Sequence, residues 1–391
     1  MDRSYDVVIA GGAAMGSSLA YHLTADTGFK GRVLVVEKDF TYAKAATSLS
    51  LSSIRQQFSQ TLNIRIGRAG VEFLRNARQT LAVEGDGPDL PIVENGYLYL
   101  ATDAGADALR ANHETQLAEG ADVVLLDPDQ LNAQFPYIDV KGIALAAFGL
   151  SGEGWFDSYT LMQAFRRKAT SLGATYVQDE VVGFVRDRAR VLGVRLAQGG
   201  EIGCGAFVNC AGASGAAKLA QALGAPIPVE ARKRCVFVFE AQGFDKFPLL
   251  IDPSGVYVRP EGRHYLVGGP PPDPDLDTQD FEVVWPMFEE VLWPALARRV
   301  PAFESLKLVR AWAGHYDLNT FDHNAIVGRA SGLENAYLAA GFSGHGVQQS
   351  PAVGRGLAEL IVHGGYRSLD LSDFAFERIA AGRPILERNV I

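Results

Sequence analysis

Near the N-terminus, a short apolar run without polar alternation leads into a glycine-rich turn. Residues 6–10 read DVVIA, and residues 11–16 read GGAAMG. A continuous apolar run of this length is typical of a strand that is buried on both faces. Residues 17–24 then predict an apolar helix, and residues 33–36 predict a second buried strand that ends at Glu37. Strand, turn, helix, strand and terminal acid, in this order, predict a dinucleotide-binding βαβ unit.

The turn departs from the G-x-G-x-x-G pattern at its middle glycine, which is Ala13. Such a turn allows backbone N–H groups and the helix N-terminus to face a pyrophosphate. Glu37 stands 21 residues after Gly16, where it can accept a hydrogen bond from a ribose hydroxyl and would repel a 2′-phosphate. The alternative interpretation is an ordinary βα turn in an α/β domain.

Apolar periodicity predicts further elements along the chain. Helices are expected at residues 63–81, 104–119, 158–172, 214–223, 280–299 and 350–363. Strands are expected at residues 97–100, 142–148, 174–177, 181–194, 206–210, 235–240, 256–259, 264–267 and 336–339. We expect Ser158 to cap its helix and Gly173 to end it. Helix 280–299 carries Trp285 and Trp293, and a proline-rich break falls at residues 270–272.

The order of these elements predicts an α/β fold with a second, α+β domain. A discontinuous Rossmann-like nucleotide-binding domain is expected over residues 1–88, 152–226 and 322–391. Residues 89–151 and 227–321 would form an inserted substrate-binding domain, in which a mostly antiparallel sheet carries a helix on one face.

Composition narrows the class of protein. The chain has 391 residues, of which 48% are apolar and 21% charged, and its net charge is −9. These values are typical of a globular protein and argue against nucleic acid or an anionic membrane surface as a partner. Cys204, Cys210 and Cys235 lack metal-site or disulfide spacing and are expected to be buried thiols. We predict no metal site, no transmembrane segment, no signal peptide and a cytoplasmic location.

A second glycine-rich turn precedes the last predicted long helix. Residues 341–346 read GFSGHG, with three glycines in six residues. Such a turn presents backbone N–H groups and the positive end of a helix dipole to electron-rich atoms. A flavin ring gains negative charge at its pyrimidine edge on reduction, so a helix end there would stabilise the reduced form. Alternatively, the glycines serve only tight packing of a loop.

Together these segments resemble a known family. Residues 11–16, Glu37, residues 53–55, 209–212, 312–328 and 341–351 occur in an order similar to that of the D-amino-acid oxidase/sarcosine oxidase superfamily, also called the glycine oxidase-like group. The resemblance spans essentially the whole chain. Its C-terminal G-F-S-G-H-G-x-x-x-x-P pattern is specific to the superfamily but not to one substrate. The resemblance implies an FAD-dependent amine oxidoreductase. Residues 312–328 most resemble a branch that contains a mitochondrial FAD-dependent protein.

The resemblance implies a set of FAD-binding residues along the whole chain. The pyrophosphate turn would comprise Gly11, Gly12, Ala13, Met15 and Gly16, and Glu37 and Lys38 would lie at the adenosine ribose. Ser48, Ser50 and Ser53 would line the pyrophosphate and ribityl chain, with Val182, Ala211 and Gly212 near the adenine end. The flavin ring would meet Gly314, Gly344, His345, Gly346, Val347 and Gln348.

Candidate substrate contacts come from three segments. Arg55 matches an arginine that faces the substrate carboxylate in sarcosine oxidases, a role that suits a bidentate, permanently charged donor; a surface ion pair is the alternative. His315 and Tyr316 are candidates to line the substrate cavity, and a structural role is the alternative for His315. Tyr257 and Arg259 share one face of a predicted strand and could orient a carboxylate, or could face solvent.

Three departures from the sarcosine oxidase pattern refine the expectation. Gly314 stands where those enzymes tether flavin through a cysteine, which predicts non-covalent FAD. Gln348 replaces a lysine that helps to bind carboxylate, so a neutral donor remains. Leu266 lies near the position of a lysine that promotes the reaction with oxygen. Without that cation the oxygen reaction should be slow, which favours a dehydrogenase that passes electrons to a quinone or protein acceptor.

The preferred function is oxidation of the C–N bond of a small amino acid or N-alkyl amino acid, by hydride transfer to FAD. An oxidase of the same substrates that forms hydrogen peroxide is one alternative. A second is oxidation of a C–O bond in a 2-hydroxyacid or glycerol phosphate, although a phosphate calls for a denser cationic cluster. A third is a non-catalytic FAD-binding assembly protein.

Overall fold

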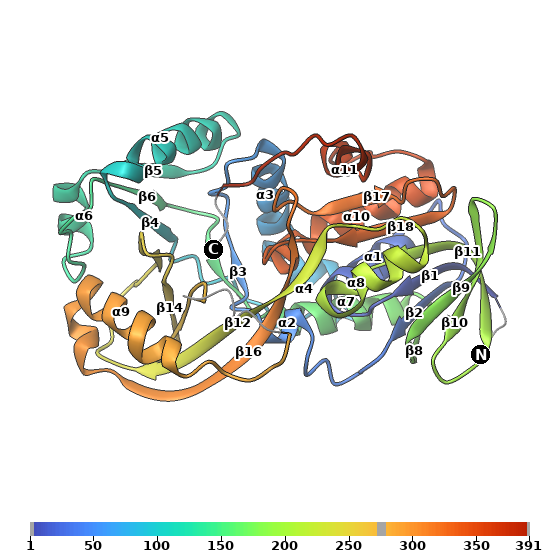
Figure 1. Ribbon diagram of the computed structural model, residues 1–391, viewed down its shortest axis with the longest axis horizontal. Coiled ribbons are helices and arrows are strands. Elements are labelled where there is room, and N and C mark those ends of the chain that lie inside the picture. Colours follow the sequence, from blue (N-terminus) through green and yellow to red (C-terminus); the bar gives the residue numbers. More distant parts are fainter. Residues whose placement is uncertain (1–3, 272–278, 389–391) are drawn as a thin grey trace.

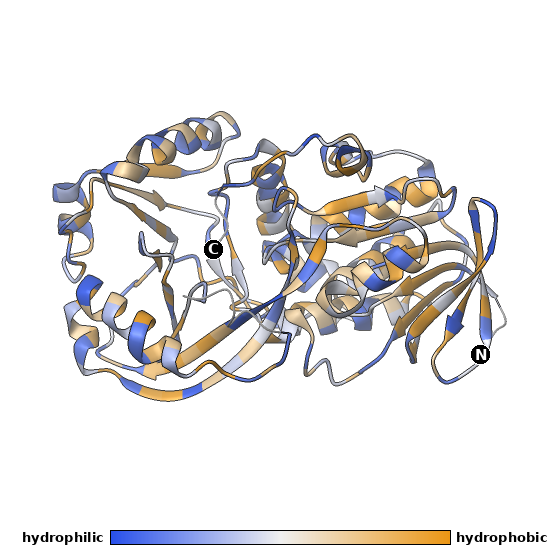
Figure 2. Ribbon diagram, in the orientation of Figure 1, coloured by the Kyte–Doolittle hydropathy of each residue, from blue (hydrophilic) through white to orange (hydrophobic). Residues whose placement is uncertain are grey.

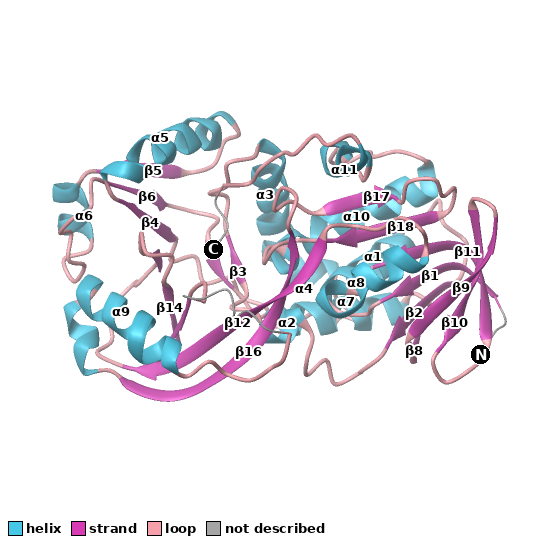
Figure 3. Ribbon diagram, viewed as in Figure 1, coloured by secondary structure: helices cyan, strands magenta, loops and turns pink. Residues whose placement is uncertain are grey.

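The computed structural model describes residues 4–271 and 279–388, and it contains two large β-sheets (Figures 1 and 3). The first sheet has the order β17-β18-β11-β1-β2-β8, and β9 and β10 extend it from β11. Pairing is parallel from β18 through β11, β1 and β2 to β8, and antiparallel for β17, β10 and β9. Its strands are β1 (Ser4–Ala10), β2 (Val33–Glu37), β8 (Thr175–Gln178), β9 (Val181–Asp187), β10 (Arg190–Leu196), β11 (Glu201–Asn209), β17 (Ile326–Arg329) and β18 (Ala336–Ala340).

Helices cover both faces of this first sheet. Val7 and Ile9 of β1 pack in one core with helices α1, α3, α7 and α10, whereas Val8 and Ala10 pack on the other face with α8. The helices are α1 (Ala14–Ala25), α3 (Thr61–Arg75), α7 (Ser158–Ser171), α8 (Gly212–Ala222) and α10 (Gly346–His363). Burial on both faces explains why β1 and β2 are continuous apolar runs, which Figure 2 shows in orange.

The second sheet has the order β16-β12-β15-β14-β13-β4-β6-β5. Its neighbours are antiparallel except β13 and β4. The strands are β4 (Tyr97–Ala101), β5 (Val123–Leu126), β6 (Leu145–Gly149), β12 (Val229–Glu240), β13 (Leu249–Ile251), β14 (Tyr257–Glu261), β15 (His264–Gly268) and β16 (Lys307–Asn319). Long strands β12 and β16 reach from this sheet to α8 of the first half (Figure 1).

The two faces of the second sheet have different roles. One face packs in a core with α6 (Pro128–Gln134) and α9 (Trp293–Arg299). The opposite face carries Tyr97, Tyr257 and, at one end, α5 (Asp103–Ala118). Residues two apart on a strand share a face, as do paired residues on neighbouring strands. Tyr316 and Gly314 of β16 therefore lie on the same side of the sheet as Tyr257. This second face is the one that contributes to the candidate site.

The remaining elements are short. They are α2 (Ala46–Leu49), the two-stranded pair β3 (Ser53–Ile54) and β7 (Gly154–Trp155), α4 (Ala77–Thr80), the π-helical turn Phe288–Leu292, the 3-10 turns Pro301–Ser305 and Ser372–Phe374, and α11 (Glu377–Ala380). In the described ranges, no helix is both long enough and apolar enough to cross a bilayer.

The predicted fold class is confirmed, but several predicted boundaries were wrong. Helix α10 begins at Gly346 and not at Ser350. Asp157 caps α7, because its side chain accepts the N–H of Thr160; Ser158 is already helical. The predicted helix 63–81 divides at Asn76.

The predicted helix 280–299 becomes regular only in its second half, where the π-helical turn is followed by α9. Its two tryptophans are exposed, Trp285 at 53% and Trp293 at 39%. Strand β5 and helix α6 were not predicted at all. Pro272 of the predicted proline-rich break lies outside the described residues.

Candidate active site

The first glycine-rich turn brings the start of α1 against the end of β11. Gly11 has φ +95°, and a Cβ there would lie 2.3 Å from the backbone oxygen of Cys210. A Cβ on Gly16 would lie 1.8 Å from the backbone oxygen of Gly11. Both positions therefore require glycine. Ala13 is the N-cap of α1 with φ −70°, a conformation that alanine adopts without strain, which explains the departure from the motif.

The N-terminus of α1 is buried, and the side chain of its N-cap residue, Ala13, makes no capping hydrogen bond. Ala14 and Met15 are buried there, and the Met15 side chain packs into the core. A buried helix N-terminus requires a partner for its free N–H groups. An anionic pyrophosphate supplies such a partner.

Glu37 is fixed beside this turn at the end of β2. Its side chain is 8% exposed, and Oε2 accepts the N–H of Gly12 at 2.7 Å while Oε1 accepts that of Asp39 at 3.0 Å. Lys38 is exposed, and its Nζ donates to Ser214 Oγ at 2.8 Å, so that it links β2 to α8. This arrangement places a carboxylate where a ribose would follow the pyrophosphate.

The adenine end of the predicted site is more open. Ala211 is the N-cap of α8, and its Cα lies 3.0 Å from where a Gly11 Cβ would stand. Gly212 has φ +56°. Val182 lies in β9 with a side chain that is 57% exposed, so it offers an edge and not an enclosing wall. The roles of these residues in FAD binding remain predictions.

The loop around α2 covers the turn from the other side. The Ser48 hydroxyl is buried, and in the described part of the chain no group hydrogen-bonds to it, so a ligand oxygen would satisfy it. Sequence reasoning missed two neighbours. Thr47 Oγ1 accepts the N–H of Ala14 at 3.4 Å, and Tyr42 packs on Ala14 with φ +55°. The glycine cradle, the uncapped helix, Glu37 and Ser48 together fit a bound FAD.

The second glycine-rich turn leads into α10 through an unusual backbone. Gly341, Ser343 and Gly344 have φ +72°, +52° and +92°. A Cβ on Gly344 would lie 2.6 Å from the ring of Tyr316, so the turn and β16 approach closely. His345 is the N-cap of the 18-residue α10, and no described side chain caps the helix. Gly346 and Val347 are half-buried in its first turn, where their N–H groups are available to a flavin edge.

A cavity lies between this turn and the second sheet. Its lining includes eight predicted site residues, namely Ser50, Ser53, Arg55, Tyr257, Tyr316, Gly344, His345 and Gln348. It adds four that were not predicted, namely Leu51, Tyr97, Leu249 and Ser343. The structure therefore brings the predicted pyrimidine-edge turn and most of the predicted substrate contacts to one place.

Arg55 is the charged centre of this cavity. It is 1% exposed, which rules out a surface ion pair. Its guanidinium lies 4.5 Å from the Phe58 ring centroid and 5.8 Å from that of Tyr97, and burial lowers its pKa. Nη2 donates to Nε2 of His345 at 2.8 Å. Burial, followed by the charge of Arg55, holds the pKa of His345 well below its usual value, so the imidazole is neutral and accepts this bond.

Two buried carboxylates that the sequence did not reveal act on Arg55 through space. Glu387 and Glu153 both favour its charged form. Glu153 is fully buried and accepts the backbone N–H groups of Gln56 and Gln57 at 2.6 and 3.0 Å. Burial raises the pKa of Glu153. Glu387 accepts Ser59 N–H at 2.8 Å at the start of α3. These carboxylates make a buried guanidinium tolerable.

Gln348 and Tyr257 complete the polar lining. The Oε1 of Gln348 accepts the backbone N–H of Arg55 at 2.8 Å, so this side chain also fixes the arginine. Tyr257 is 4% exposed, and burial, reinforced by neighbouring Tyr316, raises its pKa well above the usual value. A neutral phenol beside Arg55 can donate a hydrogen bond to an anion.

His315 does not line the cavity, which corrects the expectation that it accompanies Tyr316. Adjacent residues of a strand point to opposite faces. The ring of His315 lies 4.3 Å from that of Phe281, and its Nε2 is 2.8 Å from the backbone oxygen of Asp280. Arg259 does share a face with Tyr257, but its Nη2 donates to the backbone oxygen of Leu51 at 2.7 Å. It therefore supports the cavity wall and does not line it.

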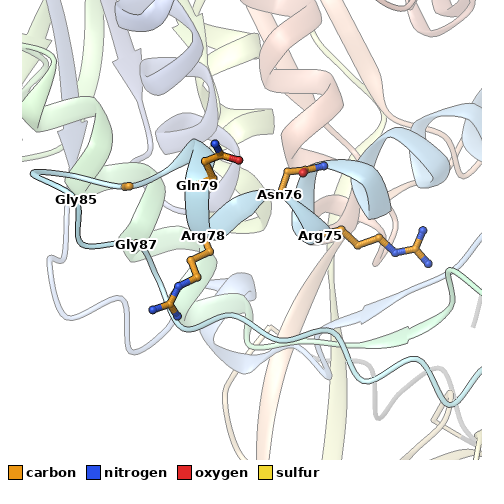
Figure 4. A pocket seen from close by; sticks show the side chains of 7 residues that line it. Arg75, Asn76, Arg78, Gln79, Gly85 and Gly87 are labelled. Atoms are coloured by element: carbon orange, nitrogen blue, oxygen red, sulfur yellow. The ribbon is translucent and has the colours of Figure 1, made fainter.

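A larger hollow, of about 380 Å³, lies at the junction of α3 and α4 (Figure 4). Arg75 and Arg78 extend from it, and Arg75 is paired with Glu94 at 2.5 Å. No predicted site residue lines it. Volume alone therefore does not mark the site.

The fold and the site are those of a nucleotide-binding oxidoreductase that contains two large β-sheets. Two glycine-rich turns lead into the N-termini of α1 and α10, and the second of these turns lines a cavity that contains the buried Arg55. Comparison with known proteins specifies the family: residues 6–360 match the DAO model, described as FAD dependent oxidoreductase. The chain belongs to this family, and it is an FAD-dependent oxidoreductase. The predicted family and cofactor are confirmed.

Individual relatives agree with this assignment. FAD-dependent oxidoreductase domain-containing protein 1 of Xenopus laevis is 42% identical over 423 aligned positions, which cover 99% of this chain and 85% of that protein. Sarcosine oxidase subunit beta of an Arthrobacter species is 26% identical, and the alignment covers 99% of this chain and 94% of that protein. The crystal structure of L-proline dehydrogenase from P. horikoshii superposes with a TM-score of 0.87 at 27% identity. The superposition covers 98% of this chain and 100% of that chain.

We expect acid precipitation to release all FAD into the supernatant. Gly314 has no side chain that could tether a flavin, and a Cβ there would lie 2.9 Å from Leu49 Cβ. Of the three buried, free cysteines, Cys235 is nearest along the sheet, but it belongs to the core on the opposite face. Absorbance of pellet and supernatant measures the distribution. A yellow pellet would contradict non-covalent binding.

Proposed function

We propose that the protein oxidises the C–N bond of a small amino acid or N-alkyl amino acid by hydride transfer to FAD, as a dehydrogenase. The observation that carries this proposal is the position of Arg55. Its guanidinium is 1% exposed, and it lines a cavity between the turn that precedes α10 and the tyrosines of the second sheet. A buried arginine in a cavity is suited to a carboxylate, which it can bind through two parallel hydrogen bonds.

The lining also favours an amine over other groups. Bound FAD supplies the hydride acceptor. Hydride loss requires a neutral amine, and a buried guanidinium disfavours a second cation nearby, so it lowers the pKa of a substrate ammonium. His345 is the one imidazole of the described lining, and its Nε2 is occupied by Arg55. The site therefore works by alignment and electrostatics and does not need a dedicated base.

Relatives support this substrate class. The names sarcosine oxidase and L-proline dehydrogenase denote oxidation of amino acids whose nitrogen is a secondary amine. The imine product of such a reaction hydrolyses in water. A phosphate-bearing alcohol is less well matched, because Arg55 is the one permanently charged side chain in the described lining.

The electron acceptor is the second part of the proposal. The position predicted for an oxygen-activating cation is Leu266, which is 5% exposed. It packs with Val236 and Val238 in an apolar cluster, against which Leu51 of the cavity wall also packs. An apolar cluster offers no charge to stabilise superoxide, so oxygen should react slowly. A quinone or a redox protein then accepts the electrons.

We expect Leu266→Lys to raise the rate constant for reoxidation by oxygen about tenfold or more, because it adds a cation behind the cavity wall. Leu266→Met keeps the volume without the charge and should behave as the wild type. Stopped-flow mixing of the reduced proteins with air-saturated buffer measures the rate. Equal rates for the lysine and methionine variants would remove this position from control of the oxygen reaction.

The substrate class is tested by anaerobic mixing with N-methylglycine, proline, lactate and glycerol phosphate, followed by air and then an artificial quinone. We expect one of the amines to bleach the flavin. The absorbance of the oxidised flavin should then return slowly in air and quickly with quinone. Bleaching by lactate or glycerol phosphate instead would assign C–O oxidation. Fast recovery in air would make the protein an oxidase. A flavin that nothing reduces would favour a non-catalytic assembly role.

A further inference from the structure

A single acidic side chain fastens the turn before α10 to strand β16. Asp317 Oδ2 accepts the N–H of Gly341 at 2.9 Å, and its backbone oxygen accepts that of Ser343 at 3.0 Å. Asn319 adds a third link, since its N–H donates to Ser343 Oγ at 3.0 Å. The turn passes through three residues with positive φ. Such a backbone persists only where its surroundings hold it.

The carboxylate of Asp317 is buried, with an exposed fraction of 9%, and lies on the opposite side of β16 from Tyr316. Burial raises its pKa to about 6, while the N–H groups of Phe342, Asp317 itself and Gly341 act in the opposite direction. Of these N–H groups, that of Gly341 hydrogen-bonds to the carboxylate, at 2.9 Å. Burial outweighs these N–H groups, so the surroundings of Asp317 disfavour its charged form.

Charged groups on the neighbouring elements do not account for the raised pKa of Asp317. On β12, Glu230 and Arg232 flank Ala231, which pairs with Asp317. His345 follows on the turn, and Lys218 lies on α8, which packs against β16. Burial and backbone N–H groups alone are responsible for the pKa shift of Asp317. Its charge is therefore not neutralised by an ion pair in the described structure.

We propose that Asp317 is a positioning residue for the flavin. It holds residues 341–346 in the shape that presents the N-terminus of α10 to the cofactor, and its negative charge offsets part of the positive potential of that helix end. This proposal rests on membership of an FAD-dependent family and not on the proposed substrate. Its outcome is therefore separable from that of the proposed function.

The sign of the pH dependence follows from the raised pKa. Between about pH 4 and pH 6 the folded protein retains a proton that an unfolded aspartate releases, so folding stability from this group falls as pH rises through that range. Above about pH 6 the carboxylate is ionised in both states. There it should disfavour the additional negative charge that a flavin acquires on reduction.

The test compares wild type with Asp317→Asn, whose amide oxygen can still accept the Gly341 N–H. Apoprotein is titrated with FAD, and the midpoint potential of the holoprotein is measured by dye equilibration from pH 5 to pH 8. At pH 8 we expect the variant to favour reduced over oxidised FAD about tenfold more than the wild type does. This corresponds to a midpoint potential that is about 30 mV higher in the variant. The difference should vanish near pH 5, and the affinity for oxidised FAD should change less than about threefold.

Two further variants separate charge from shape. Glu230→Gln removes a charge from the neighbouring strand, but the side chain of Glu230 is 53% exposed, so solvent screening should leave the potential unchanged. Asp317→Ala removes the acceptor and should weaken FAD binding about tenfold or more at every pH. Equal potentials for wild type and Asp317→Asn at pH 8 would overturn the electrostatic role. An alanine variant with wild-type FAD affinity would overturn the positioning role.

Discussion

Replacing Arg55 by lysine is expected to lower kcat/KM for a carboxylate substrate about 10- to 100-fold, mainly through KM. A charged hydrogen-bonded contact is worth about 1.5–3 kcal/mol, and lysine cannot reproduce the bidentate geometry of a guanidinium. The buried position of Arg55, at 1% exposure, removes solvent as a competing partner. Steady-state kinetics with the best amine of the anaerobic panel measures the effect.

Because Arg55 also bonds His345 and packs on Phe58, a loss of activity alone would not prove contact with substrate. The control is the same amine without its carboxylate. Wild type and Arg55→Lys should oxidise that amine at similar rates, since the lost interaction is absent in both. Arg310→Lys, an exposed position on the same sheet, should match wild type with both substrates. Equal losses with both amines would make the arginine a structural residue.

Substituting Gly11 by alanine is expected to weaken FAD binding about 100-fold or more, so that the protein purifies without colour. The new Cβ would lie 2.3 Å from the backbone oxygen of Cys210, on a residue with φ +95°. Both the clash and the strained backbone would move the turn away from the pyrophosphate. Fluorescence titration of apoprotein with FAD measures the affinity, and circular dichroism checks that the fold remains.

Ala13→Gly is the matched variant in the same turn. Ala13 has φ −70°, so removing its methyl group relieves no strain and opens space at the pyrophosphate. We expect FAD affinity to stay within about threefold of wild type or to improve. If Gly11→Ala bound FAD as tightly as Ala13→Gly, the turn would not be the cradle.

Much of the fold could be predicted because its core strands are buried on both faces. The runs over β1 and β2 leave no polar alternation, and a βαβ unit explains them together with the following acid. The predicted start of α10 was four residues too late, because Gly346 and Gln349 give no apolar periodicity. Its first turn is determined by the close contact between Gly344 and Tyr316, a tertiary feature that local sequence does not encode.

The candidate site was only partly predictable for the same reason. The motif predicted Arg55, but the side chains that enclose it come from distant segments. Tyr97 lies on β4, Glu153 precedes β7, and Glu387 belongs to the C-terminal segment. Burial of an isolated acid in a loop leaves no pattern in the sequence. For His315 the structural alternative is favoured, because strand alternation places it opposite Tyr316.

The central claim is that a cavity built around Arg55 delivers an amine substrate to FAD for hydride transfer. The most direct measurement is anaerobic stopped-flow bleaching of the holoprotein by N-methylglycine or proline, with and without deuterium on the carbons bonded to nitrogen. We predict bleaching at the flavin band near 450 nm that is about two- to sixfold slower with deuterium, as expected where that C–H bond breaks in the barrier-crossing step. Failure of every amine to bleach the flavin, while a hydroxyacid does so, would contradict the account.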